Sequence, residues 1–101
     1  MKFTRFEIEL LADDWPFEID HQVAHLFKHP KLGLQDIADV WASDPLFYPA
    51  KPPAHWLMVA EVEGRVLMVP LAPSKTERTK CRPIGCYVAS VGLARMYKED
   101  R

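Results

Sequence analysis

The stretch from Trp56 to Leu71 constrains the fold most, because two apolar runs flank a central Glu63-Gly64 pair. Glycine at the second position of a two-residue loop accepts a positive φ, which a tight β-hairpin requires. With this loop, Val62 lies opposite Arg65 and the apolar residues alternate onto two faces. One face carries Trp56, Met58, Ala60, Val62, Leu67, Val69 and Leu71, and the other carries Leu57, Val59, Val66 and Met68. Both faces are apolar, so we expect the hairpin in the middle of a sheet, covered on both sides for much of its length.

Two helical patterns precede the hairpin. A first helix is predicted from His21 to His29, and Pro30 ends it. Apolar residues at i, i+3, i+4 and i+7 predict a second amphipathic helix from about Leu34 to Ala42, with Ile37 and Trp41 on its apolar stripe. Because the connection between the two is short, we expect a helical hairpin that covers one face of the sheet.

The N-terminal residues alternate between two faces. From Phe3 to Leu11 one of these faces is largely polar, which predicts a strand. Residues 1–15 are therefore assigned to an extra N-terminal strand, which could pair with a sheet edge or with a second copy of the chain. Phe17-Glu18-Ile19 is a candidate for a further short strand.

Prolines shape the remaining connections. The segment from Leu46 to His55 carries Pro49, Pro52 and Pro53, so it cannot be a central strand and is predicted as a stiff loop. Cys81 to Ala89 is predicted as an irregular third strand, and Ser90 to Glu99 as a closing helix. The predicted fold is a single α+β domain over residues 1–101. It has a small antiparallel sheet, a two-helix hairpin packed on one face and a short C-terminal helix.

Charge and cysteine content limit the classes of function. Thirteen basic and fourteen acidic side chains give a formal charge of −1, so any RNA contact needs a local basic patch. Cys81 and Cys86 lack a metal-binding spacing and are interpreted as reduced thiols of a cytoplasmic protein. No apolar run approaches the ~20 residues of a spanning helix, so no membrane partner is expected.

A metal site is one alternative on the first predicted helix. His21, His25 and His29 are four residues apart and share a face, and two imidazoles at i and i+4 can hold a metal ion. The glutamate of the known motif is missing, however, because Gln22-Val23-Ala24 separates the first two histidines. A solvated polar face explains the pattern more simply, and no metal or other cofactor is assigned.

Metal-free acid–base chemistry is another alternative. Lys28, His29 and His55 could exchange protons or bear positive charge near neutral pH. Cleavage of RNA by its own 2′-hydroxyl needs a proton acceptor, a proton donor and positive charge on the phosphate. For each residue taken alone, surface charge remains the simpler interpretation.

The order of short motifs between Phe17 and Glu99 follows a known family pattern. The motifs are Phe17-Glu18-Ile19-Asp20, Lys28-His29, Asp44-Pro45, His55-Trp56, Gly64-Arg65 and Arg95-Met96-Tyr97-Lys98-Glu99. In this order they resemble the BrnT family of toxins, which belongs to type II toxin–antitoxin pairs and shares the RelE-like fold. The family reads Phe-Glu-Trp-Asp, Lys-His-Gly, Asp-Pro, Glu-Arg-Trp, a Gly-Arg hairpin, Ser-Ala-Arg and a closing Tyr-Glu.

The resemblance implies a metal-independent ribonuclease that is neutralised by a ribbon-helix-helix antitoxin. Lys28 and His29 match the family's Lys-His pair, Arg65 its hairpin arginine and Tyr97 its closing tyrosine. The chain departs from the family at three places: Pro30 replaces a glycine, Ala54-His55 replaces Glu-Arg, and Gly85-Cys86-Tyr87 replaces Ser-Ala-Arg. Tyr87 cannot supply the permanent charge of the strand arginine that it replaces.

Two hypotheses follow, and whether the chain is an enzyme stays open. In the first, a toxin-like endoribonuclease uses Lys28 and Arg82 on phosphate, His29 or His55 to move protons, and Tyr87 or Tyr97 as a stacking or hydroxyl group. Arg65, Lys80 and Arg95 would then help to hold the RNA. In the second, the fold has lost catalysis and acts as a binding or self-associating module, with a homodimer as one form. The missing arginine, the net charge close to zero and the added N-terminal strand favour this hypothesis.

Overall fold

The hairpin predicted around Glu63-Gly64 forms the centre of the sheet. The computed structural model describes residues 4–19 and 32–101. In it, β2 (Trp56–Val62) and β3 (Arg65–Pro73) pair antiparallel in the predicted register, with Val62 opposite Arg65. Glu63 and Gly64 have φ values of 50° and 80°. Two successive positive values produce the two-residue turn that matches the twist of the flanking strands.

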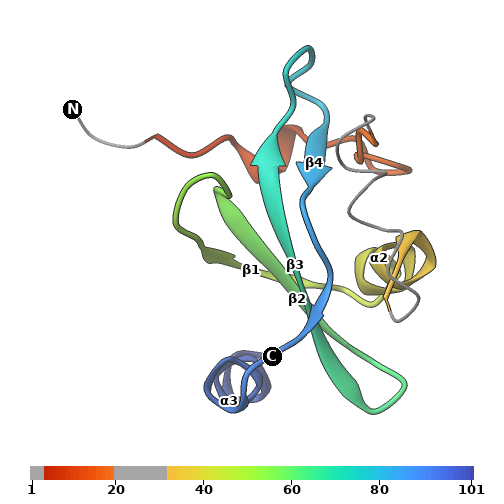
Figure 1. Cartoon of the computed structure of the whole chain (residues 1–101), viewed down its shortest axis with the longest axis vertical. Coiled ribbons are helices and arrows are strands. Elements are labelled where there is room, and N and C mark those ends of the chain that lie inside the picture. The colour runs from red at the N-terminus through yellow and green to blue at the C-terminus, as the bar shows by residue number, and fades with distance from the viewer. Residues whose placement is uncertain (1–3, 20–31) are drawn as a thin grey trace.

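Three shorter strands complete the sheet around this hairpin. Strand β1 (Leu46–Pro49) pairs with β2, while β4 (Cys81–Pro83) and β5 (Tyr87–Val88) both pair with β3. The order is β1-β2-β3-β4, with β5 also beside β3, and every pairing is antiparallel (Figure 1). The structure therefore confirms a small antiparallel sheet within an α+β fold.

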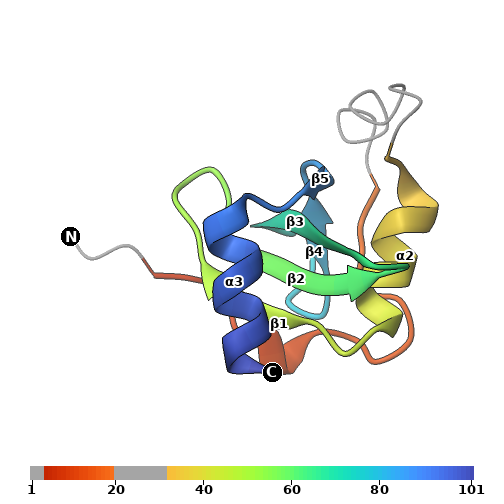
Figure 2. The same cartoon turned by 90° about the horizontal axis from the view of Figure 1, so that it is seen from below.

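Helices lie on opposite faces of the sheet, as Figure 2 shows. Helix α2 (Leu34–Ala42) buries Ile37 and Val40 against one face. Helix α3 (Val91–Asp100) covers the other face, where Tyr97 packs with Val59 and Val66. Coverage on both sides explains why both faces of the hairpin are apolar. No helix in the described parts of the chain is both long and apolar enough to cross a membrane.

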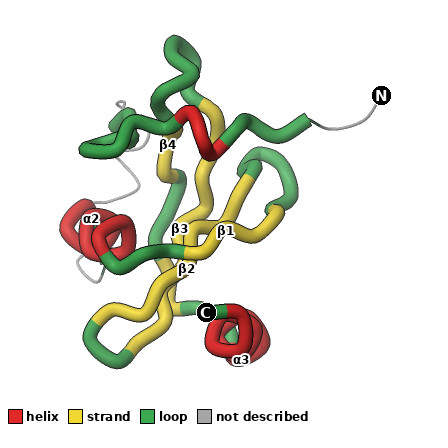
Figure 3. Tube along the Cα trace, turned by 180° about the vertical axis from the view of Figure 1, so that it is seen from behind, coloured by secondary structure: helices red, strands yellow, loops and turns green. Residues whose placement is uncertain are grey.

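The predicted N-terminal strand is wrong over the part that the structure describes. Residues 4–7 are irregular and a 3-10 turn, η1 (Ile8–Leu10), follows them (Figure 3). Side chains, instead of a backbone ladder, hold the segment. The Phe6 amide donates to His55 Nδ1, and Trp56 Nε1 donates to the Phe6 carbonyl. Alternation arises here because Phe6 and Ile8 pack against the core while Glu7 and Glu9 are exposed.

The loop predicted from Leu46 to His55 is also wrong for its first four residues, which form β1. Strand β1 is the outermost strand beside β2, so a proline at its end removes no hydrogen bond from the interior of the sheet. Leu46 and Phe47 are partly buried and pack onto opposite faces of the sheet. Apolar packing of the side chains therefore outweighs the prolines that follow.

The remaining predictions have different outcomes. The irregular strand from Cys81 to Ala89 is confirmed, since it divides into β4 and β5. The closing helix is confirmed as α3, and the Leu93 amide donates to the Ser90 hydroxyl at its N-cap. The candidate strand at Phe17 reduces to one parallel bridge with Cys81. The predicted helix from His21 to His29 lies outside the described residues.

Candidate functional site

Lys28 and His29, the predicted catalytic pair, lie outside the described residues. The other predicted site residues are placed in four separate surroundings. His55 lies in the loop before β2, and Lys80 lies in the β3–β4 loop. Arg82 and Tyr87 lie on β4 and β5. Arg95 and Tyr97 lie on α3, and Arg65, at the start of β3, lines the same hollow as Arg95.

His55 fastens the N-terminal segment to the sheet. Its Nδ1 accepts a hydrogen bond of 2.9 Å from the Phe6 amide, and its ring stacks on the Phe6 ring with 5.4 Å between centroids. The His55 carbonyl accepts from Arg5 Nε at 2.9 Å. Burial, and to a lesser extent the Arg5 charge, lowers the His55 pKa below its usual 6.5. The neutral imidazole is thus the form that this contact requires, since a protonated Nδ1 cannot accept.

Tyr97 is buried between α3 and the sheet. Its side chain is 4% exposed, and its hydroxyl accepts from the Glu61 amide at 3.3 Å. The Arg101 guanidinium lies 5.6 Å from the centre of its ring. These contacts attach α3 to β2, so in this structure the hydroxyl faces the protein interior.

Arg82 and Tyr87 lie on neighbouring short strands. Arg82 Nε donates to the Pro73 carbonyl at 3.1 Å, across the β3–β4 pairing. Tyr87 is 51% exposed, and its ring lies directly over the Gly85 backbone. A Cβ at Gly85 would come within 2.5 Å of that ring, so a larger residue there would displace the exposed ring from its present position.

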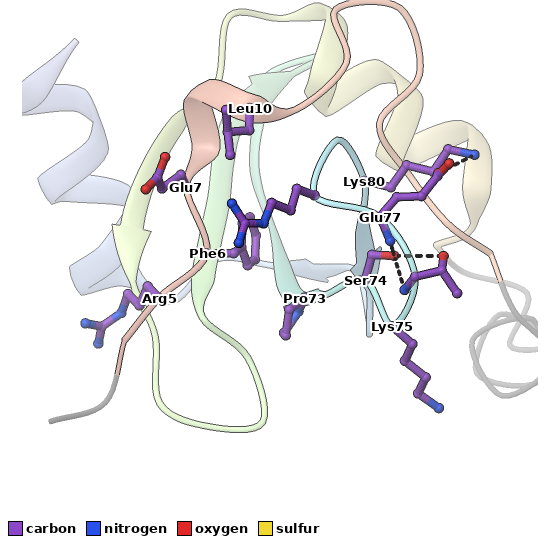
Figure 4. A pocket seen from close by; sticks show the side chains of 11 residues that line it. Arg5, Phe6, Glu7, Leu10, Pro73, Ser74, Lys75, Glu77 and Lys80 are labelled. Atoms are coloured by element: carbon purple, nitrogen blue, oxygen red, sulfur yellow. Dashed lines mark hydrogen bonds and ion pairs between the residues drawn. The ribbon is translucent and has the colours of Figure 1, made fainter. Parts of the chain in front are cut away.

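Lys80 lines a small hollow between the N-terminal segment and the β3–β4 loop (Figure 4). The hollow has a volume of about 360 Å³, with Phe6 and Leu10 on one side. Lys75 and Arg78 also line it. Lys80 forms an ion pair of 3.5 Å with Glu77, which cancels part of the local positive charge.

Hydrogen bonds to Ser74 order this loop. The Ser74 hydroxyl accepts from the amides of Thr76 and Glu77, both at 3.1 Å, and it donates to the Glu18 carboxylate. A serine that closes a turn in this way stabilises a local bend. The β3–β4 loop is therefore a defined platform that presents Lys75 and Arg78 to solvent.

Arg65 and Arg95 meet at a second hollow, of about 550 Å³, between the β2–β3 turn, β5 and α3. We call it the basic groove. Lys98 joins the two arginines at its rim, where Glu99 is the one carboxylate, and Val88 and Val91 lie among its apolar residues. Sequence reasoning missed Lys98, although its spacing of i+3 from Arg95 places the two on one side of a helix.

A third hollow, of about 730 Å³, lies where α2 runs into β1, and we call it the acidic hollow. Three carboxylates line it, together with two aromatic rings, and no lysine or arginine does. The residues are Asp13, Asp14, Asp44, Trp41 and Phe47. Sequence reasoning missed this grouping because residues 13–14 and 44 are brought together by the fold.

No metal site is formed by the described residues, where no three histidine, cysteine or acidic side chains are arranged to hold an ion. The face formed by His21, His25 and His29 is outside that part of the chain. Cys81 and Cys86 are free thiols in the interior. Burial raises the pKa of Cys81 to about 12 and that of Cys86 to about 11, so neither thiol is a reactive nucleophile at neutral pH.

No protein-family model, curated protein or solved structure matches this chain. The geometry of the described residues and the order of the sequence motifs therefore provide the basis for a functional assignment.

Proposed function

We propose that this chain is a binding module without catalysis, on a divergent BrnT-like scaffold with the RelE-like fold. The small antiparallel sheet, the Gly64-Arg65 turn and the terminal helix that carries Tyr97 are compatible with such a scaffold. Tyr87 in place of the family's strand arginine supports the loss of cleavage, because a phenol carries no charge to hold phosphate at neutral pH.

One observation carries the proposal: three side chains that are candidates for RNA cleavage are engaged in contacts that hold the fold together. His55 Nδ1 accepts from the Phe6 amide, Tyr97 of α3 is buried against the sheet, and Arg82 donates to the Pro73 carbonyl. An acid–base pair must reach the same phosphodiester within about one hydrogen bond or one bridging water. These three groups instead stabilise the N-terminal segment, the helix–sheet contact and the β3–β4 pairing, respectively.

The basic groove also supports the proposal, because it offers a surface for a partner. Val88 is 54% exposed and Val91 is 77% exposed, and both line this groove. Exposed apolar residues rimmed by charges are typical of sites where a protein contacts another molecule.

A ribonuclease is the second candidate, and the β3–β4 loop favours it. Lys75, Arg78 and Lys80 border the hollow drawn in Figure 4, and cations on an ordered loop are suited to phosphate contacts. Lys28 and His29 would then provide the proton transfers that the resemblance implies.

Incubation of the purified chain with total RNA, at low salt and with EDTA, separates the two candidates. A binding module leaves the RNA intact at large protein excess, and its expression causes no growth arrest. The matched variant Lys28→Ala/His29→Ala should behave in the same way as the unmodified chain.

Cleavage that resists EDTA and disappears in Lys28→Ala/His29→Ala or in Arg82→Ala would overturn the proposal in favour of the ribonuclease. Cleavage of equal rate in all three proteins would indicate a contaminating nuclease, and the preparation would be repeated from a second purification route until the rates separate or vanish.

A further inference from the structure

The described residues that line the basic groove carry an excess of positive charge. Arg65, Arg95 and Lys98 surround it against one carboxylate, that of Glu99. Among the described residues, none of the three cations forms an ion pair within 4.0 Å, and the pairs found involve Lys80 and Arg101 instead. Cations placed around exposed valines favour an occupant that has both carboxylates and an apolar side chain.

Among the described residues, no strand pairs with the outer edge of β5, the strand beside this groove. Val88 lies opposite Leu67, and the next residue, Ala89, donates its amide to the Val66 carbonyl. Hydrogen-bonded and non-bonded pairs alternate along an antiparallel ladder, so the Val88 amide and carbonyl point away from β3. Such an edge can accept another extended segment.

A segment with the required chemistry is present elsewhere in the same chain. Asp13, Asp14 and Trp15 form an exposed loop of two carboxylates followed by an indole that is 40% exposed. Asp44 lies beside this loop in the acidic hollow. The loop therefore complements the groove, because it supplies the opposite charge and one apolar side chain.

The two surfaces have no lining residue in common, so a second copy can occupy one while the other stays available. A contact between two different patches is heterologous, and it continues from copy to copy until a ring closes or a filament grows. The formal net charge of −1 leaves little overall repulsion between copies.

We propose that the basic groove binds the Asp13-Asp14-Trp15 loop of a second copy, which gives a head-to-tail assembly. The inference rests on the proposed function and names its partner. Arg65, Arg95 and Lys98 pair with the two carboxylates, and Trp15 lies over Val88 and Val91. The contact area of one loop is small, so association is weak, concentration-dependent and reduced by salt.

Sedimentation velocity on the full chain tests the inference at several concentrations, in low and in high salt. The groove variant is Arg95→Glu/Lys98→Glu and the loop variant is Asp13→Lys/Asp14→Lys, all at exposed positions. We expect each variant alone to associate at least about tenfold more weakly than the unmodified chain, because like charges then face each other. We expect a mixture of the two to associate again, since each reversed patch meets its opposite.

Lys51→Glu/Lys75→Glu is the matched control for Arg95→Glu/Lys98→Glu, because it makes the same change in charge at two exposed sites outside the groove. It should leave the association unchanged. A monomer at every concentration in low salt would overturn the inference, and so would reversed variants that associate like the unmodified chain or that fail to recover on mixing. Failure of the inference is distinguishable from failure of the proposed function. The first is observed as a loss of association in sedimentation, and the second as cleavage of RNA.

Discussion

Replacement of His55 by phenylalanine tests whether this residue serves structure. His55→Phe keeps a ring that can stack on Phe6 but removes the Nδ1 acceptor of the 2.9 Å bond from the Phe6 amide. Loss of one neutral hydrogen bond at a partly exposed position costs about 1 kcal/mol. For a domain of this size, that corresponds to a fall of about 4–8 °C in the melting temperature.

The pH dependence of the free energy of unfolding is a more specific test than its value at a single pH. Because the folded pKa of His55 lies below its unfolded value of 6.5, the unfolded chain binds the proton more tightly. The stability contribution of the neutral ring is therefore fully present above pH 6.5 and is lost as pH falls through the folded pKa. His55→Phe should flatten this loss, so the difference between the two proteins in unfolding free energy shrinks on acidification.

Urea unfolding followed by circular dichroism, at about pH 8 and about pH 5, measures this difference directly. The other three histidines are unchanged in the variant, so their contribution cancels in the comparison. An unchanged pH dependence in His55→Phe would refute the reasoning, since the neutral imidazole would then not be what the folded state favours.

Three further predictions concern the core, the turn and the thiols. Leu67→Ala removes a fully buried side chain from β3 and should cost about 3 kcal/mol, whereas Leu34→Ala, at a residue 42% exposed, should cost less than about 1 kcal/mol, both by urea unfolding. Gly64→Ala meets no neighbouring atom within 4 Å but keeps a φ of 80°, so its cost of about 1 kcal/mol reflects the backbone alone. Cys81 and Cys86 should resist a thiol-labelling reagent in the folded chain and react fully in denaturant; rapid labelling of the native protein would contradict their burial.

Local signals made the hairpin and α2 predictable. The Glu63-Gly64 turn dictates the register of β2 and β3, and the apolar pattern on both faces requires cover on both sides. The apolar stripe that includes Ile37 predicts the bounds of α2, although it carries no information on the strands against which the helix packs. In each case the information lies within a few residues of the element that it specifies.

The N-terminal segment shows where local signals fail. Its alternation is real, but Phe6 is held by His55 and Trp56, about fifty residues further along the chain. An extended segment held by side chains has the same period as a strand, so no pattern within the segment distinguishes the two. Similarly, β1 forms because Leu46 and Phe47 find apolar partners that the proline count does not reveal.

Only part of the candidate site could be found from the sequence. The sequence predicts Arg65 and Arg95 as residues that help to hold RNA, yet their position beside Val88 at one groove depends on how α3 packs near the β2–β3 turn. Imidazole titrates near neutral pH, so the sequence indicates His55 as a proton carrier, but its role in the structure follows from the hydrogen bond that it accepts from the distant Phe6 amide. Spacing identifies the kinds of side chain, and the fold determines what each one contacts.

The central claim is that this chain acts through association and that it associates at the basic groove. Amide chemical shifts recorded as a function of protein concentration test this claim most directly. A ¹⁵N-labelled sample is diluted stepwise in low-salt buffer. The account predicts concentration-dependent shifts confined to residues 64–66 and 88–98 and to residues 13–15 and 41–47. Shifts that centre instead on the β3–β4 loop around Lys75, or spectra that do not change with concentration, would contradict it.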